Sequence, residues 1–277
     1  MTYMQEPTSL TDEQFDRISG FVRGVCGINL HTGKKELVKA RLGRRLRTLG
    51  LASFEDYFDF VREDSSGDEV TAMLDALATN LTSFFREPRH FAYLSERVLP
   101  PIRKGASRRI RVWSAGCSSG EEPYTIAIVL NEAIGDLSCW DAKILATDLS
   151  TKVLGRARTG VYDAEKLEEV PRSIVVKYFE GTPSDSTGSY QAGDRLRRLI
   201  TFARLNLLGE WPMKGPFDAI FCRNVMIYFD RETQLDLVNR FVKLLAPGGI
   251  LFVGHAESLA GGAGILEYVE PAVYRKP

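Results

Sequence analysis

The stretch from Ile110 to Gly120 reads IRVWSAGCSSG, and its order of residue types decides the fold class. The apolar and β-branched run Ile110–Ala115 predicts a strand, and the small residues Gly116–Gly120 predict a tight turn. A helix is expected from Glu121 to about Ile134, because Pro123 stands in its first turn, where proline is favoured. The stretch is therefore a strand–turn–helix unit.

Strands and helices continue to alternate on the C-terminal side of this unit. Lys143–Thr147 predicts a second strand that ends at Asp148, and Ser150 is expected to cap the next helix. A later strand, helix and strand are predicted over Phe217–Cys222, Glu232–Leu245 and Gly249–Val253. This alternation is typical of a parallel sheet covered by helices on both faces.

Residues from about 161 to 204 interrupt the alternation. Pro171–Phe179 fits one short helix, and Arg195–Phe202 is strand-like after a turn at Gly193-Asp194. We expect an inserted antiparallel hairpin subdomain. An edge strand of such a subdomain can accept a peptide by strand addition, and an appendage without a partner is the alternative.

The first hundred residues predict helices only. Thr11–Gln14 has the form of a capping box, and apolar residues then recur at helical spacing until Gly27 ends the helix. Further helices are expected from about Gly33 to Leu49, after Ser53 and around Val70–Leu77.

The length of 277 residues fits about two domains. We expect an all-α N-terminal domain over residues 1–83, a linker over 84–101 and an α/β domain over 102–277, with the hairpin subdomain inserted at about 161–204.

The net charge of the chain is zero, because Lys plus Arg and Asp plus Glu each number 36. A neutral chain implies no general attraction to nucleic acid. Electrostatic recognition is therefore expected to be local.

Cysteine and histidine usage bears on compartment and metal binding. The four cysteines contain no C-x-x-C pair, which favours unpaired thiols in a reducing compartment, and so a cytoplasmic protein. The chain shows neither a signal peptide nor the roughly 20 apolar residues of a membrane span, so no direct membrane insertion is expected. His31, His90 and His255 are far apart in sequence, so we expect no zinc site or other metal site.

The second predicted helix concentrates positive charge, because seven basic residues between Gly33 and Leu49 stand against the single acid Glu36. Clustered basic side chains select negative surfaces, so we expect this helix to dock an acidic partner. A solvated face, balanced by the acidic run Glu55–Asp64, is the alternative. The residues of the expected docking face are Lys39, Arg41, Arg44 and Arg45.

Ligands of open α/β sheets bind beyond the C-terminal ends of the strands. The turn Gly116–Gly120 lets a backbone approach a ligand closely, but it matches neither G-x-G-x-x-G nor a P-loop. Glu121 and Glu122 would repel a pyrophosphate and attract a cation, although they also compensate a helix dipole. Asp148 can accept from both hydroxyls of a ribose. Together these residues describe a nucleoside that carries positive charge, and S-adenosylmethionine is that molecule.

Four stretches of the chain resemble the CheR family of chemoreceptor glutamate methyltransferases. They are Thr79–Glu87, Ser114–Tyr124, Leu205–Leu208 and Phe221–Phe229. The resemblance covers nearly the whole chain, and the long motifs occur in the family's order. It implies a class I S-adenosylmethionine-dependent, Rossmann-like methyltransferase domain with an inserted antiparallel β-subdomain, preceded by an all-α domain.

The resemblance also implies which residues form the site. Arg86 and Tyr228 match the positions that the family places near the transferred methyl, so they are the expected catalytic residues. The implied substrate is the cytoplasmic domain of a chemoreceptor, whose glutamates become methyl esters in sensory adaptation while S-adenosylhomocysteine is released. A receptor C-terminal peptide is a possible ligand of the β-subdomain. The implied cofactor contacts are Asn80, Thr82, Arg86, Glu122, Asp148, Asn206, Leu207, Arg223 and Asn224.

The implied reaction needs little acid–base chemistry. A glutamate carboxylate has a pKa of about 4.3 and is an ionised nucleophile at neutral pH, so positioning is the main requirement. Arg86 is expected to orient this carboxylate, or else to pair with the carboxylate of the cofactor. The Tyr228 hydroxyl is expected to hold an oxygen lone pair or the methyl group, with simple aromatic packing as the alternative.

Two other functions remain open from the sequence. One is a class I methyltransferase for nucleic acid or protein nitrogen, although Arg223–Met226 stands where such enzymes typically carry an Asn-Pro-Pro-Tyr-like run. The other is a non-catalytic scaffold that senses the cofactor. A monomer is expected, because no heptad seam or long apolar stripe is left unused.

Overall fold

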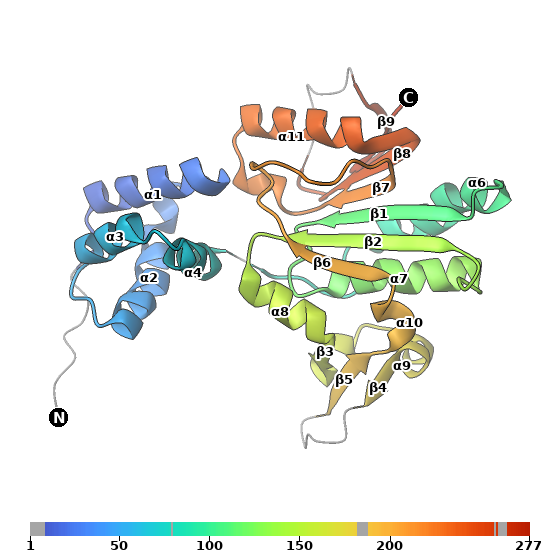
Figure 1. Ribbon diagram of the computed structural model, residues 1–277, viewed down its shortest axis with the longest axis horizontal. Coiled ribbons are helices and arrows are strands. Elements are labelled where there is room, and N and C mark those ends of the chain that lie inside the picture. Colours follow the sequence, from blue (N-terminus) through green and yellow to red (C-terminus); the bar gives the residue numbers. More distant parts are fainter. Residues whose placement is uncertain (1–8, 79, 182–187, 258, 260–264) are drawn as a thin grey trace.

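The computed structural model describes residues 9–78, 80–181, 188–257, 259 and 265–277. A group of helices lies at one end of a long sheet, beyond the arrowheads of strands β1 (Arg109–Ala115) and β2 (Asp141–Asp148), and a small second sheet lies to one side (Figure 1). Thr79 of the first family motif and residues 182–187 of the predicted insertion lie outside the described residues.

The N-terminal group consists of helices packed around one apolar core. The Thr11 side chain accepts from the Gln14 amide while Gln14 bonds back to Thr11, which confirms the predicted capping box, and Gly27 ends the first helix in the left-handed conformation. Phe15, Val38 and Tyr57 are buried in the shared core. The helices are α1 (Asp12–Cys26), a 3₁₀ turn η1 (Thr32–Lys34), α2 (Lys35–Leu49), α3 (Phe54–Glu63) and α4 (Asp68–Leu77).

The segment predicted as a linker is largely helical. It contains α5 (Pro88–Tyr93), the π-helical turn η2 (Leu94–Val98) and the start of α6 (Leu99–Lys104). Phe84, Phe91 and Leu94 are buried in the same apolar cluster as the sheet. This segment therefore packs as part of the α/β unit, while the domain limits themselves stay predictions.

The large sheet has the strand order β6-β2-β1-β7-β8-β10-β9. The pairs from β6 to β8 are parallel, and β10 is antiparallel to both β8 and β9. The chain moves outward from β1 in one direction to β2 and β6 and in the other to β7 and β8, so the strand order reverses at β1. The strands not yet bounded are β6 (Ile200–Arg204), β7 (Phe217–Cys222), β8 (Leu245–Val253), β9 (Glu267–Glu270) and β10 (Val273–Arg275).

Helices cover both faces of this sheet, as the sequence predicted. Alternate residues of β1 point to opposite faces: Val112 packs in the cluster of α7 (Glu121–Ile134), whereas Trp113 packs in the cluster of α11 (Arg231–Leu244). Helix α8 (Thr151–Thr159) begins at the predicted cap Ser150 and packs on β2 and β6. Among the described helices, none is long and apolar enough to cross a membrane.

The insertion is a three-stranded antiparallel sheet with the order β3-β5-β4. The prediction of a hairpin strand over Arg195–Phe202 is wrong, because Ile200–Arg204 instead forms β6, which pairs in parallel with β2. Ile200 and Phe202 pack against the core of the large sheet. The elements of this region are β3 (Val161–Asp163), η3 (Ala164–Leu167), α9 (Arg172–Tyr178), β4 (Phe179–Gly181), β5 (Ser189–Ala192) and α10 (Asp194–Arg197).

Candidate functional site

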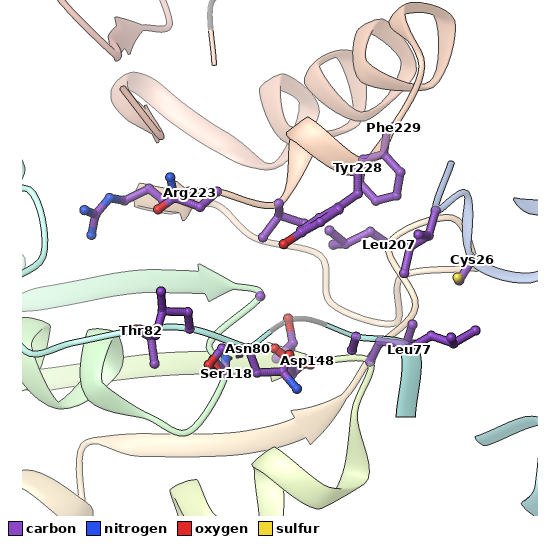
Figure 2. A pocket seen from close by; sticks show the side chains of 18 of the residues that line it. Cys26, Leu77, Asn80, Thr82, Ser118, Asp148, Leu207, Arg223, Tyr228 and Phe229 are labelled. Carbon is purple, nitrogen blue, oxygen red and sulfur yellow. Dashed lines mark hydrogen bonds between the residues drawn. The ribbon is translucent and has the colours of Figure 1, made fainter. Parts of the chain in front are cut away.

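A cavity lies between the helical group and the C-terminal ends of β1, β2 and β7. Figure 2 shows Asp148, Asn80 and Ser118 on one side of the cavity and Tyr228 and Leu207 across from them. The structure brings together every predicted catalytic and cofactor-binding residue, because the lining includes Asn80, Thr82, Arg86, Glu122, Asp148, Asn206, Leu207, Arg223, Asn224 and Tyr228.

The β1–α7 turn and the end of β2 form one side of the cavity. Gly116 and Gly120 have positive φ values of 89° and 101°, which explains the glycines of this turn. Asp148 accepts from the Ser118 amide at 2.8 Å and from the Ser150 amide at 2.9 Å, one bond to each carboxylate oxygen. Burial raises the pKa of Asp148, and these backbone bonds oppose the rise. The carboxylate is thus fixed in place with acceptor capacity left for a ligand.

Glu122 also lines the cavity, whereas Glu121 does not belong to its described lining. Glu121 is buried, accepts from the Ser119 hydroxyl at 2.7 Å and lies 3.7 Å from the Lys166 ammonium. Of the two acids that the sequence placed beside a cationic ligand, only Glu122 therefore faces the site. Glu122 Oε1 accepts from the Ser114 hydroxyl at 2.6 Å.

Arg223, at the end of β7, links two carboxylates. Its Nη1 donates to Glu122 Oε2 at 3.0 Å, and its Nη2 and Nε donate to Glu87 Oε2 at 3.0 and 3.3 Å. Only 2% of the Arg223 side chain is exposed. Burial raises the pKa of Glu122, and the Arg223 charge opposes the rise. Sequence reasoning missed Glu87, although it directly follows the expected catalytic residue Arg86.

The wall opposite Asp148 contains Tyr228, which ends the 3₁₀ turn η4 (Met226–Tyr228). The Tyr228 carbonyl accepts from the Asn29 amide at 2.8 Å, and the Lys34 ammonium lies 5.2 Å from the centroid of the Tyr228 ring. The Asn206 side chain donates to the Val25 carbonyl at 2.6 Å. The helical group therefore touches two of the predicted site residues directly.

The helical group also supplies an apolar part of the lining, which the sequence analysis did not predict. Leu30 and Cys26 are buried, and Ile28 is half-buried. No local motif marks these residues, because they reach the site only through the packing of one domain against the other. The apolar lining residues from this group include Cys26, Ile28, Leu30, Leu37 and Leu77.

The four expected docking residues lie outside the described lining of the cavity. They differ in whether their side chains bind within the helical domain. Arg41 donates to the carbonyls of Leu77 and Ala78, and Arg45 makes two hydrogen bonds to Glu69 at 2.5 and 2.7 Å. Both arginines thus hold α2 against α4. Arg44 is exposed, and 41% of the Lys39 side chain is exposed. Of the four, Arg44 thus offers an exposed side chain to a partner, and Lys39 offers a partly exposed one.

Two histidines that are far apart in sequence are close in space. The ring centroids of His90 and His255 are 5.2 Å apart, and with Glu87 they form a group whose ligand atoms lie within 4.8 Å of one another. The distance between these histidines in sequence therefore does not separate them in the fold, and the absence of a metal site stays a prediction. Burial, followed by the nearby Arg223 charge, lowers the pKa of His90 to about 4. The Glu87 carboxylate of this group is paired with the Arg223 guanidinium at 3.0 Å.

Comparisons with protein families match both parts of the chain. Residues 13–78 match the family described as "CheR methyltransferase, all-alpha domain", and residues 80–274 match "CheR methyltransferase, SAM binding domain".

Similar full-length proteins are chemotaxis methyltransferases. Identity is 42% to "Chemotaxis protein methyltransferase 2" of Pseudomonas aeruginosa, over 95% of this chain and 93% of that protein. It is 41% to "Chemotaxis protein methyltransferase" of Escherichia coli, over 93% and 88% of the two chains. The sequence is also 38% identical to "Chemotaxis protein methyltransferase" of Borreliella burgdorferi, over 97% of this chain and 95% of that protein.

The fold and the matches together define a methyltransferase with an S-adenosylmethionine-binding domain and an all-α N-terminal domain. The chain belongs to the CheR methyltransferase family. It is accordingly a protein-glutamate O-methyltransferase of chemotaxis, which confirms the family, fold class and activity that the sequence predicted.

Proposed function

We propose that the cavity between the two domains is where this enzyme transfers a methyl group from S-adenosylmethionine to glutamates in the cytoplasmic domain of a chemoreceptor. The observation that carries the proposal is the convergence of all ten predicted site residues, from motifs spread over about 150 positions, on one cavity. The product on the receptor is a glutamyl methyl ester, and the other product is S-adenosylhomocysteine.

The donor set suits a cationic nucleoside. The fixed Asp148 carboxylate is an acceptor for the two ribose hydroxyls, and Glu122, which is hydrogen-bonded to Ser114 and Arg223, faces the amino acid end of the cofactor. Ile28 and Leu30 offer apolar surface to the adenine ring. Asn80, Thr82, Asn206, Leu207 and Asn224 complete the proposed cofactor contacts, together with Arg86 and Arg223.

Positioning is the main task of the catalytic residues. S-adenosylmethionine, when bound, supplies a methyl group on a positively charged sulfur. The receptor glutamate, with a pKa of about 4.3, is already ionised at neutral pH and needs no general base. Arg86 has a planar guanidinium that holds both oxygens of this carboxylate, and the Tyr228 hydroxyl fixes the approach of the reacting oxygen. No metal is used in this mechanism.

The direct test is transfer of label from methyl-labelled S-adenosylmethionine to purified receptor. We expect base-labile label on the receptor and its loss when the target glutamates are changed to alanine. Label on nucleic acid or on receptor nitrogen would favour another methyltransferase reaction. Cofactor binding without any transfer to receptor would favour the sensing scaffold and contradict the proposal.

We propose that the exposed side chains of α2 dock the receptor, with Lys39 and Arg44 as the main contacts. Receptor helices rich in glutamate would complement this charge. Arg44→Glu should raise the KM for receptor and make it less dependent on salt, with unchanged S-adenosylhomocysteine affinity. The matched variant Arg45→Ala should instead lower thermal stability, because it leaves the Glu69 carboxylate, with only 6% of its side chain exposed, without its cationic partner. Equal receptor kinetics for Arg44→Glu and the wild type would refute docking at this face.

The small sheet is proposed to bind a receptor C-terminal peptide by strand addition. Its central strand is β5, so β3 and β4 are the two edge strands in the described part of the insertion. An isolated tail peptide should bind without competing with S-adenosylhomocysteine, since the small sheet contributes no described residue to the cavity lining. Absence of saturable binding at high micromolar peptide would leave the sheet as a structural appendage.

We further propose that the enzyme acts in the cytoplasm as a monomer, with neither nucleic acid nor direct membrane insertion. Its four cysteines are free thiols, although Cys26, Cys117 and Cys222 are buried and only Cys139 is exposed. Unpaired thiols suit a reducing compartment. Sedimentation of the purified protein at a mass near 31.0 kDa is the expected result for a monomer.

A further inference from the structure

The backbone on either side of Arg86 is unusual. Phe85 has φ 53° and Glu87 has φ 56°, so two residues with side chains adopt the left-handed region around the expected catalytic arginine. Residues other than glycine rarely adopt this region, and such a conformation persists only where the surrounding structure imposes it. Some other part of the molecule must therefore hold this segment.

The Phe85 amide donates to the Thr125 hydroxyl at 3.2 Å, and Arg223 holds the two residues that follow. Its guanidinium donates to the Arg86 backbone carbonyl as well as to the Glu87 carboxylate, so it binds two consecutive residues of the segment. Its Nη1 donates to the Glu122 carboxylate in the first turn of α7. The Arg86 backbone is thus tied to the end of β7 and to α7. The Arg86 side chain is half-buried and lines the cavity, and its Nη1 donates to the Leu81 carbonyl at 3.0 Å.

Glu87 fixes Arg223 in this role. Glu87 Oε2 accepts from Arg223, and Glu87 Oε1 accepts from the His255 amide beyond β8 at 3.3 Å. Burial acts to raise the pKa of Glu87, but the Arg223 charge and these hydrogen bonds outweigh it and leave the pKa below its usual value. Glu87 does not belong to the described lining of the cavity, so its effect on a ligand there passes through another residue.

We propose that Glu87 is a positioning residue for methyl transfer, which acts by holding Arg223 on the Arg86 backbone and so aims the Arg86 guanidinium into the cavity. This inference rests on the proposed role of Arg86. The proposal gives the Glu87 carboxylate a function in the reaction and not only in the stability of the fold, although Glu87 does not belong to the described lining of the cavity.

A double-mutant cycle on the full-length enzyme tests the proposal. The variants are Arg86→Ala, Glu87→Ala, the combined double variant and Glu87→Gln, with Glu96→Gln as the control because Glu96 is an exposed glutamate of the neighbouring helical turn. For each we measure kcat and KM for receptor, S-adenosylhomocysteine affinity by calorimetry, and melting temperature. Should Glu87→Ala melt below the assay temperature, Glu87→Gln takes its place in the cycle.

We expect Glu87→Ala to change the same parameter as Arg86→Ala, with a loss on the order of 10²-fold, the effect of misplacing a reacting group by about 1 Å. Glu87→Gln should recover part of the loss, because its amide oxygen still accepts one hydrogen bond. In the Arg86→Ala background, Glu87→Ala should cost less than about threefold more, because coupled residues are not additive. Glu96→Gln should match the wild type.

Other outcomes would overturn the inference in distinguishable ways. Losses that multiply in the double variant, or a fully active Glu87→Ala beside an impaired Arg86→Ala, would reject the positioning role and leave the proposed function intact. A fully active Arg86→Ala would reject the proposed role of Arg86, and the inference with it. A loss in Glu87→Ala that only follows a lower melting temperature would assign Glu87 to stability alone.

Discussion

The two walls of the cavity are built in different ways. The wall from the α/β domain is polar, and its groups, such as Asp148 and Glu122, are fixed by hydrogen bonds at strand ends and helix starts. The wall from the helical domain contains the apolar side chains of Ile28 and Leu30, which are fixed by packing. The polar wall suits recognition of a charged nucleoside, and the apolar wall suits exclusion of water from it.

This difference explains what the sequence reveals of each wall. A strand end is a local feature, so its polar residue can be read directly from the pattern. The apolar wall forms where the end of α1 and the α1–α2 connection pack against the loops that carry Asn206 and Tyr228. One contact between them is the hydrogen bond from the Asn29 amide to the Tyr228 carbonyl. Such contacts join residues about 180 to 200 positions apart, and no local pattern marks them.

The largest expected effect is that of Arg86→Ala, at the edge of the polar wall. We expect kcat to fall on the order of 10²–10³-fold, as when one donor to a transition state is removed, with nearly normal S-adenosylhomocysteine affinity. Arg86→Lys should recover little, because lysine cannot bind both carboxylate oxygens. A parallel loss of affinity would instead assign Arg86 to the cofactor carboxylate, and full activity would exclude both roles.

Asp148→Ala tests the polar wall itself. Loss of a charged acceptor should weaken S-adenosylhomocysteine binding by about 1.5–3 kcal/mol, and Asp148→Asn should lie between this variant and the wild type. Because burial raises the pKa of Asp148, cofactor affinity should begin to fall with decreasing pH above the usual titration range of aspartate. Unchanged affinity in a folded alanine variant, measured by calorimetry, would reject Asp148 as the ribose ligand.

Ile28→Ala tests the apolar wall and should have the smallest effect. Burial is worth about 0.8 kcal/mol per CH₂, and Ile28 is half-buried, so cofactor affinity should fall only about two- to tenfold while kcat stays near the wild-type value. Ile28→Val should change affinity less. A loss of cofactor affinity as large as that of Asp148→Ala would remove the distinction between the two walls. An unchanged affinity would mean that the adenine ring binds away from Ile28.

Much of the fold was predictable from the sequence, because its signals are local. The capping box at Thr11, the cap at Ser150 and the strand that ends at Asp148 occur where the pattern places them. The strand Ile200–Arg204 was assigned to the wrong sheet, since a strand pattern does not identify its partner. The C-terminal strands β9 and β10 were not predicted.

The candidate site was predictable only where a motif or strand end marks it. Glu87 belongs to a quoted motif, but its contact with Arg223 joins positions 136 residues apart. The basic helix shows the same limit, because charge density alone does not reveal that Arg41 and Arg45 bind within the domain. Proximity of His90 and His255 likewise arises from the folded chain alone.

The most direct test of the central claim is a crystal structure of the enzyme with S-adenosylhomocysteine and a glutamate-containing receptor peptide. The account predicts the ribose hydroxyls on Asp148, the adenine against Ile28, and the sulfur and the peptide carboxylate on the side of Arg86 and Tyr228. A nucleoside bound away from Asp148, or a glutamate carboxylate beyond the reach of both Arg86 and Tyr228, would contradict it.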